Sequence, residues 1–178
     1  MRTRRMLMIL VAVALGACAR VPGQDVPDVR TPPAVVNEML RLANVTADDV
    51  VYDLGSGDGR IVIAAAKDRG ARGVGYEIDP ALVKQATDRA RSLRLSDRVT
   101  FNQGDLFQAD LKPATVVTLY LGNELNRRLQ PKLLNELRPG SRVVSHNFDM
   151  PDWVPTQTME VSSNQGRHTL YLWVVPAR

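Results

Sequence analysis

The sequence is poor in cysteine and histidine, with one Cys and two His among its 178 residues. A single Cys excludes a disulfide-stabilised scaffold, and one Cys with two His supplies few ligands for a zinc site, so we expect no metal. Long hydrophobic runs are also missing at the start, where the apolar run from Met6 to Ala17 has 12 residues. A membrane-spanning helix needs roughly 20 apolar residues, so this run is too short to span a bilayer comfortably.

Net charge is scarce outside the first residues. The formal charge is +4, and Arg2, Arg4 and Arg5 supply three of the 23 basic side chains. The rest of the chain carries 20 basic and 19 acidic side chains, which leaves no global electrostatic footprint for nucleic acid. A hydrophobic content of 44% and a charged content of 24% are ordinary for a globular protein and exclude wholesale disorder. The length allows one domain with a full core.

The first thirty residues predict an exported, lipid-anchored start. Basic residues, a short apolar run and small residues at its end give residues 1–17 the pattern of a secretory signal peptide. The sequence Leu15-Gly16-Ala17-Cys18 resembles the bacterial lipobox, in which the Cys receives a diacylglyceryl group. The alternative is an ordinary Cys18 that follows an uncleaved signal anchor. Residues 18–30 then predict a flexible tether, and residues 31–178 predict a folded domain.

From residue 31 onward, patterns typical of helices and strands alternate. Thr31 is expected to cap a first helix with two prolines in its first turn, and Asp79-Pro80 is expected to open a later helix. Strands are predicted over 50–54, 73–78, 99–101, 115–121, 142–147, 156–161 and 169–175, and further helices over 61–67, 80–93 and 123–137. This order predicts an α/β fold with a doubly wound, mainly parallel, Rossmann-like sheet and a C-terminal antiparallel hairpin.

A glycine-rich turn joins the first predicted strand to the next helix. It reads Asp53-Leu54-Gly55-Ser56-Gly57-Asp58-Gly59, and its glycines let the backbone bend sharply and approach a ligand. Taken alone, such a turn also occurs without a ligand. A dinucleotide site needs G-x-G-x-x-G, but Arg60 occupies the place of the last glycine. Asp53 and Asp58 would repel a pyrophosphate, whereas they favour S-adenosylmethionine (SAM), which carries a sulfonium and an ammonium and no phosphate.

Two further acids lie at the end of the second predicted strand and after the third. Glu77 stands where a carboxylate can accept hydrogen bonds from both ribose hydroxyls of an adenosine. Gly104-Asp105-Leu106-Phe107 follows the third strand, where a carboxylate and apolar neighbours can address an adenine. Each acid alone is typical of a solvated loop, but ligands bind outside the carboxyl ends of such sheets, where all three acids are expected. The predicted cofactor-binding residues are Asp53, Gly55, Ser56, Gly57, Gly59, Glu77, Asp105 and Leu106. The pattern from Asp53 through Asp105 resembles the class I SAM-dependent methyltransferases.

The chain beyond the fourth strand resembles a narrower group. Its pieces are Tyr120-Leu121-Gly122-Asn123-Glu124-Leu125-Asn126, Ser145-His146-Asn147-Phe148-Asp149-Met150 and Asp152-Trp153. They are similar to the protein-lysine methyltransferases of the ATP synthase c-subunit and the adenine nucleotide translocase and to their prokaryotic relatives, over residues 31–175. The resemblance implies SAM as the cofactor, a protein partner that presents a lysine, and a place near a membrane. Gly122-Asn123 departs from the apolar residue and proline expected there, so the entry to the following helix can differ.

Methyl transfer from a sulfonium needs neither a metal nor a covalent intermediate, and it depends mainly on positioning of the nucleophile. Candidate residues at the carboxyl edge are Tyr120, Glu124, Asn126, His146 and Asp149. We predict that Tyr120, Glu124 and His146 are catalytic and act on the acceptor more than on the cofactor. The alternatives are a core aromatic for Tyr120, a helix first-turn charge for Glu124, and a buried histidine bonded to backbone for His146.

The leading hypothesis is a SAM-dependent protein-lysine N-methyltransferase that acts on a membrane-associated protein. The alternatives are a small-molecule methyltransferase and a non-catalytic exported lipoprotein that kept the fold. The arginines before the apolar run predict that the domain faces the periplasm. Because SAM is made in the cytoplasm, a start codon placed too early, with a cytoplasmic protein, is the competing interpretation.

Overall fold

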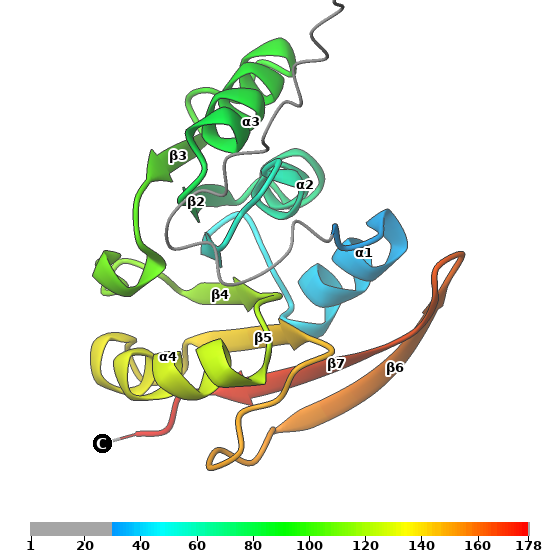
Figure 1. Ribbon diagram of the computed structural model, residues 1–178, viewed down its shortest axis with the longest axis vertical. Coiled ribbons are helices and arrows are strands. Elements are labelled where there is room, and N and C mark those ends of the chain that lie inside the picture. Colours follow the sequence, from blue (N-terminus) through cyan, green and yellow to red (C-terminus); the bar gives the residue numbers. More distant parts are fainter. Residues whose placement is uncertain (1–29, 178) are drawn as a thin grey trace, which may run out of the picture.

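The computed structural model describes residues 30–177 (Figure 1). The predicted signal peptide, most of the predicted tether and the predicted lipid attachment at Cys18 lie outside the described residues. In chain order the elements are α1 (Pro33–Leu42), β1 (Val50–Leu54), α2 (Arg60–Arg69), β2 (Arg72–Glu77), α3 (Pro80–Ser92), β3 (Val99–Gln103), the 3₁₀ helix η1 (Leu106–Gln108), β4 (Val116–Leu119), α4 (Asn123–Glu136), β5 (Arg142–His146), β6 (Gln157–Ser163) and β7 (Gly166–Val174).

The strands form one seven-stranded sheet in the order β3-β2-β1-β4-β5-β7-β6. Strands β3, β2, β1, β4 and β5 pair in parallel, and β7 runs antiparallel to both of its neighbours, β5 and β6. The predicted α/β fold, with a mainly parallel doubly wound sheet and a C-terminal antiparallel hairpin, is therefore confirmed. The strand order reverses between β1 and β4, which is the point where ligands bind in open sheets of this kind.

Helices cover the two faces of the sheet unequally (Figure 1). On one face, α1 and α2 bury apolar side chains against Val51, Val116 and Val144 of the central strands, and α3 packs beside α2. On the other face, α4 buries a row of leucines against β1, β4, β5 and β7, and η1 packs against the same cluster. Both faces are thus closed by apolar contact, and the carboxyl ends of the central strands are left for the loops that follow them.

The helix ends follow local chemistry, with one exception. The Asp79 side chain accepts a hydrogen bond from the Ala81 nitrogen and caps α3, and Pro80 occupies its first turn, as predicted. Helix α2 ends at Gly70 with φ +72°, a left-handed conformation that glycine adopts readily. The expected cap by Thr31 is wrong. Pro32 is the N-cap of α1, and the Thr31 hydroxyl instead contacts the His146 ring.

Several boundaries differ from the predicted ones. Strand β4 ends at Leu119 rather than at residue 121, because Leu121 leaves the sheet to pack over Gly55. The hairpin strands are longer than predicted around their turn, since their ladder continues to the pair Ser163–Gly166. Helix η1 was not predicted; Asp105 starts it by accepting a hydrogen bond from the Phe107 nitrogen.

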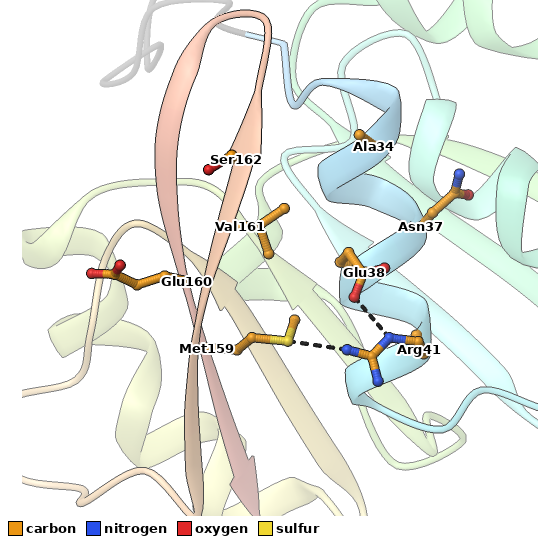
Figure 2. Close-up of a pocket in the computed structure, with 8 residues that line it drawn as sticks. All are labelled: Ala34, Asn37, Glu38, Arg41, Met159, Glu160, Val161 and Ser162. Atoms are coloured by element: carbon orange, nitrogen blue, oxygen red, sulfur yellow. Dashed lines mark hydrogen bonds and ion pairs between the residues drawn. The ribbon is translucent and has the colours of Figure 1, made fainter.

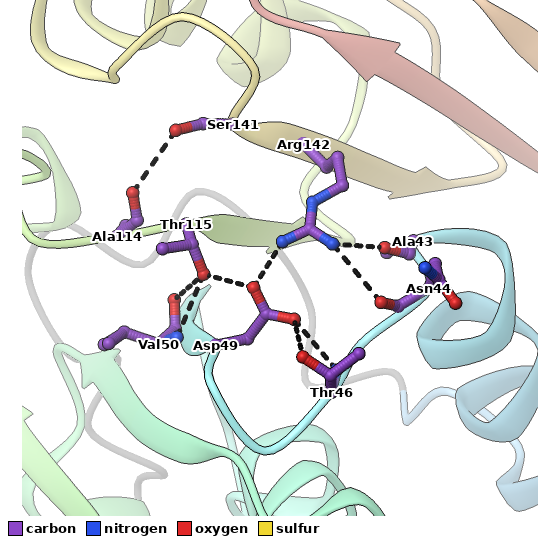
Figure 3. A network of polar contacts seen from close by, with 9 residues as sticks. All are labelled: Ala43, Asn44, Thr46, Asp49, Val50, Ala114, Thr115, Ser141 and Arg142. Atoms are coloured by element: carbon purple, nitrogen blue, oxygen red, sulfur yellow. Dashed lines mark hydrogen bonds and ion pairs between the residues drawn. The ribbon is translucent and has the colours of Figure 1, made fainter.

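A polar network joins the amino ends of β1, β4 and β5, at the edge opposite the glycine-rich turn (Figure 3). The buried Asp49 carboxylate accepts from the Thr115 hydroxyl at 2.7 Å, from the Thr46 nitrogen at 2.8 Å and from Arg142. Arg142 also donates to the Ala43 carbonyl at 2.9 Å. Burial raises the pKa of Asp49, but these hydrogen bonds and the Arg142 charge outweigh burial and leave the pKa below its usual value. The network ties three strands to the end of α1.

A groove separates α1 from the edge strand β6 (Figure 2). Across it, the Arg41 guanidinium donates to the Met159 sulfur at 3.1 Å, and within α1 it donates to Glu38 at 2.7 Å. The groove is lined by Ala34, Asn37, Glu38, Arg41, Met159, Glu160, Val161 and Ser162. None of the residues predicted to bind cofactor or to be catalytic lines it, so it is separate from the candidate site.

Candidate functional site

The glycine-rich turn connects β1 to α2 at the carboxyl edge of the sheet. The backbone nitrogens of Gly55 and Ser56 both donate to the Tyr76 carbonyl of β2 at 2.9 Å. Gly55 has φ +80°, and a Cβ atom there would lie 2.7 Å from the Leu121 side chain. A side chain at Gly55 would therefore be strained and would displace the segment that follows β4.

Gly59 has a packing role in the same turn. Its φ is +74°, and a Cβ atom would lie 2.4 Å from the Phe101 ring and 2.9 Å from Ala86. Gly59 thus lets the start of α2 approach β3 and α3 closely. This close packing explains why a glycine is needed here even without a ligand. The contact of Gly59 with the cofactor stays a prediction.

Glu77 ends β2 and fastens the glycine-rich turn. Its Oε2 atom accepts from the Gly57 nitrogen at 2.9 Å, and its Oε1 atom accepts from the nitrogens of Ile78 and Asp79 at 2.8 and 3.0 Å. The carboxylate is buried. Because each carboxylate oxygen has about two acceptor positions, Oε2 keeps capacity for one more donor, such as a ribose hydroxyl.

Asp53 is a buried carboxyl group next to the turn. Its Oδ1 atom accepts from the Thr118 hydroxyl at 2.7 Å, and only 3% of the residue is exposed. Burial raises its pKa to about 7, and the nearby charges of Glu77 and Asp58 add to this effect, while the Thr118 hydrogen bond opposes it. Since no cationic partner of Asp53 is found among the described residues, a bound cation would stabilise the ionised form.

Contrary to expectation, the Asp58 carboxylate is already paired with arginines and is not an unpaired negative charge for a ligand. Its carboxylate accepts from Arg60 at 2.9 and 2.8 Å, and Arg89 and Arg30 lie 3.5 and 3.8 Å away. Burial raises the pKa of Asp58, but the Arg60 hydrogen bonds and charge, with the charge of Arg89, lower it below the usual value. Asp58 therefore ties the turn to α2, α3 and the segment before α1.

Ser56 lies in the turn with a buried hydroxyl oxygen that has no hydrogen-bond partner in the structure. Buried polar atoms are almost always paired, so an unpaired one marks a place where a ligand or water is expected. The hydroxyl lies against the backbone of β2, since a Cβ atom at Gly75 would approach it to 2.6 Å.

The predicted adenine side lies at the start of η1. The Asp105 side chain is exposed and accepts from the Phe107 nitrogen at 2.9 Å. Leu106 and Phe107 are half-buried, and the Arg128 guanidinium of α4 lies 4.5 Å from the centre of the Phe107 ring. The sequence interpretation missed this cation–π contact, which positions the segment after β3 against α4.

The predicted acceptor residues gather at the ends of β4 and β5. Tyr120 is half-buried, and its ring centre lies 4.0 Å from that of His146 and 5.9 Å from that of Phe148. Glu124 is exposed in the first turn of α4 and pairs with Arg127 at 2.7 Å. Glu124 therefore has the environment of a surface helix charge, whereas the half-buried Tyr120 packs on the buried His146 ring.

His146 is fully buried. Its Nδ1 atom lies 3.2 Å from the Thr31 hydroxyl, and its Nε2 atom lies 2.9 Å from Nδ1 of His168. Burial lowers its pKa to about 4, with a further contribution from His168. The alternative of a histidine bonded to backbone is wrong, because both partners are side chains. With both nitrogens engaged, His146 lies beneath Tyr120 and has no free atom for an acceptor.

Asn126 of α4 fastens the loop after β5. Its buried side-chain nitrogen donates to the Ser145 hydroxyl at 3.0 Å and to the Phe148 carbonyl at 2.9 Å. Its side-chain oxygen is buried without a partner in the structure. The loop that carries Phe148 and Asp149 is thereby held against the start of α4, beside Tyr120.

These features fit a ligand with positive charge and no phosphate, such as SAM. Within residues 30–177, the buried Asp53 carboxyl has no cationic partner and the Ser56 hydroxyl has no hydrogen-bond partner, and Glu77 keeps an acceptor position near glycine backbone. A phosphate would meet Asp53 and Glu77, which repel it. The strand order and the strand-end acids together define a Rossmann-like methyltransferase that uses S-adenosylmethionine.

Known proteins narrow this class. The ANTKMT methyltransferase domain family matches residues 53–157. A protein-lysine N-methyltransferase from Saccharolobus islandicus (strain REY15A) is 44% identical over 151 residues, which are 84% of this chain and 94% of that relative. An RNA methyltransferase from Salinibacter ruber, crystallised in complex with S-adenosyl-L-homocysteine, has a TM-score of 0.80 and 53% identity, covering 84% of this chain and 95% of that one. The chain belongs to the ANTKMT methyltransferase domain family.

Relatives from animals match over less of their length. The lysine N-methyltransferase of the ATP synthase c-subunit from Xenopus laevis is 37% identical over 130 residues, which are 73% of this chain and 55% of that protein. The chain therefore spans little more than half of that relative. Among residues 30–177, no helix combines the length and the apolar character that crossing a membrane requires.

Proposed function

We propose that this enzyme transfers a methyl group from SAM to the side-chain amine of a lysine in a protein. The observation that carries the proposal is the 44% identity, over 94% of its length, to a protein named for lysine N-methylation. The relative of known structure is named as an RNA methyltransferase, which makes RNA the competing acceptor. The nearly neutral charge of the chain after residue 17 favours protein over a polyanion.

On the cofactor side, each proposed residue offers a matching group. The Asp53 carboxyl and the backbone of Gly55 and Gly57 would hold the amino-acid end of SAM, and Glu77 would accept from the ribose. Asp105 and Leu106 would hold the adenine. When bound, SAM supplies an electrophilic methyl group on a sulfonium. The protein contributes binding, orientation and a buried negative charge on this side.

On the acceptor side, the lysine must lose a proton before it attacks, because its reference pKa is about 10.4. Glu124 is 66% exposed at its side chain and would attract the lysine as a cation when Arg127 releases it. Tyr120 is half-buried at the end of β4 and would orient the neutral amine. His146, which the sequence suggested as catalytic, is proposed to act through Tyr120, since its own nitrogens are engaged.

We also propose that the enzyme is held at a membrane through Cys18 and that its acceptor is a membrane-associated protein. The lipobox-like sequence before Cys18 supports the anchor, and a diacylglyceryl group supplies the two chains that stable anchoring needs. Fractionation of wild type and Cys18→Ser, beside a periplasmic reporter fusion, tests this. Full-length, unlipidated protein in the cytoplasmic fraction would contradict the anchor and leave the methyltransferase proposal intact.

The acceptor is tested by incubating the full-length enzyme with SAM labelled in its methyl group and with membrane, soluble-protein, RNA and small-molecule fractions. Glu77→Ala serves as the control with impaired cofactor binding. Label in a protease-sensitive band, with methyllysine found by mass spectrometry, supports the proposal. Label that ribonuclease removes, or that passes a small-molecule filter, contradicts it. Tight SAM binding by calorimetry without any label in these fractions would indicate the non-catalytic alternative.

A further inference from the structure

The two histidines of the chain meet beneath the acceptor side of the site. His146 ends β5, and His168 lies on the neighbouring strand β7, where both are buried on the face that α1 covers. Their rings are joined by an Nε2 to Nδ1 contact of 2.9 Å. The outer nitrogens reach hydroxyls, Thr31 on one side at 3.2 Å and Ser163 on the other at 2.8 Å.

A neutral imidazole has one nitrogen that donates and one that accepts, so two neutral arrangements satisfy all of these contacts. In one form, Thr31 donates to His146, His146 donates to His168, and His168 donates to Ser163. In the other form, every donor and acceptor is reversed, and both hydroxyls can serve in either sense. Two protonated rings would place two N–H groups face to face in the 2.9 Å contact. The pair therefore excludes a doubly charged state and fixes the orientation of both rings.

The fixed ring of His146 supports Tyr120. The two ring centres are 4.0 Å apart at an interplanar angle of 31°, which is the closest ring contact of Tyr120 in the described part of the chain. The other end of the chain of contacts reaches the cofactor side, because the Thr31 carbonyl accepts from Arg60 at 2.9 Å and Arg60 binds Asp58 of the glycine-rich turn. Thr31 thus contacts both halves of the site.

We propose that His146 and His168 are a positioning pair that holds the Tyr120 ring in the orientation needed at the methyl acceptor. The inference rests on the proposed methyl transfer and extends it to His168, Thr31 and Ser163. Positioning matters because a displacement of about 1 Å at a reacting centre can lower a rate by about a hundredfold. Neither histidine exchanges a proton with the acceptor, since every ring nitrogen is engaged by another side chain.

Nuclear magnetic resonance of the full-length protein tests the pair without any acceptor. With only two imidazoles, the ring nitrogens can be assigned through His168→Asn, and the Tyr120 ring protons through Tyr120→Phe. We expect coupled tautomers at pH 7, in which one ring carries its proton on Nε2 when the other ring does. We also expect the Tyr120 ring to flip slowly. His168→Leu should accelerate the flips at least tenfold. Independent tautomers, or unchanged flips in a folded His168→Leu protein, would overturn the pair.

Turnover and cofactor affinity provide the second readout. His168→Leu and Thr31→Val should lower kcat at least tenfold and change the SAM dissociation constant less than twofold. His168→Asn can still hydrogen-bond to His146 and should recover most of the loss. Thr169→Val, beside His168 on β7, is the matched control and should change neither value. Full turnover in His168→Leu would overturn the inference. If the wild-type protein showed the coupled tautomers but methylated no protein, only the proposed acceptor would be contradicted.

Discussion

The Oε2 atom of Glu77 lies 2.9 Å from the backbone nitrogen of Gly57, so one carboxylate joins the end of β2 to the glycine-rich turn. The same side chain holds the first residues after β2 through its other oxygen. Glu77 therefore shapes the turn before any ligand binds, and its loss affects the shape of the site as well as the contact with a ribose.

The first prediction concerns this carboxylate. Glu77→Ala should weaken SAM binding at least about tenfold, because each hydrogen bond to a charged group contributes roughly 1.5–3 kcal/mol. Titration calorimetry measures the affinity. Glu77→Gln keeps one acceptor oxygen and should fall between Ala and wild type. An unchanged affinity in a folded Glu77→Ala protein would rule out the ribose contact.

The second prediction concerns pH and Asp53. Its pKa of about 7 in the free protein should fall when a cation binds, so SAM affinity should rise between about pH 6 and pH 8 and binding should release a proton. Calorimetry in buffers of different ionisation enthalpy measures that proton. Asp53→Asn should bind more weakly at the upper pH and show no such rise.

The raised pKa of Asp53 also makes the stability of the fold depend on pH. Because the folded pKa of Asp53 is raised above its unfolded value of 3.8, its contribution to the unfolding free energy is present at low pH and is lost as pH rises through about 7. The unfolding free energies of ligand-free wild type and Asp53→Asn, measured in urea, should therefore diverge between about pH 4 and pH 7. Parallel pH profiles would contradict a raised Asp53 pKa.

The third prediction separates the acceptor residues. Tyr120→Phe should lower kcat about tenfold or more, as loss of a positioned polar group does, and should leave the SAM dissociation constant near wild type. Glu124→Gln should raise KM for the acceptor more than it lowers kcat, since Glu124 is exposed and paired with Arg127. If either variant bound SAM poorly yet methylated normally at saturating cofactor, the assigned roles would be wrong.

The fourth prediction compares two glycines. Gly59→Ala should destabilise the fold by about 3 kcal/mol, because the new methyl group would lie 2.4 Å from Phe101 at a φ of +74°, which combines overpacking with backbone strain. Gly104→Ala meets nothing within 4 Å and is the matched control. Urea denaturation curves measure both, and equal midpoints would contradict the packing role of Gly59.

The fifth prediction addresses the network away from the site. Arg142→Met leaves the buried Asp49 carboxylate without its cation and should cost about 3 kcal/mol. SAM affinity should stay the same, since the network lies at the amino ends of the strands. The double variant Asp49→Asn with Arg142→Met should recover part of the loss in thermal unfolding. A weaker SAM affinity in folded Arg142→Met would show that the two edges are coupled.

The order of strands and helices was predictable because each signal is local. Asp79-Pro80 sets the start of α3, and a short, mainly apolar run that ends at the glycine-rich turn sets β1. The mainly parallel, doubly wound character of the sheet followed from general rules for alternating elements, but those rules did not give the order of its strands. The end of β4 was not predictable, because it depends on Leu121 packing over Gly55, a contact between segments 66 residues apart.

The candidate site could be predicted only in part from the sequence, for the same reason. The sequence places acids at or just after the carboxyl ends of β1, β2 and β3, but it does not show which of them are already paired. Asp58 is bound by arginines from two helices and from the segment before α1, and His146 finds Thr31 and His168 at separations of 115 and 22 residues. Such partners depend on tertiary packing, which local patterns do not encode.

Strand β7 runs against the other strands, so Val174 at its end lies beside Arg142 at the start of β5. The last strand thus leaves the sheet at the edge opposite the glycine-rich turn, whereas Thr31 enters beside that turn. A linker placed after β7 would therefore attach the enzyme to a sensor surface by the edge opposite the glycine-rich turn.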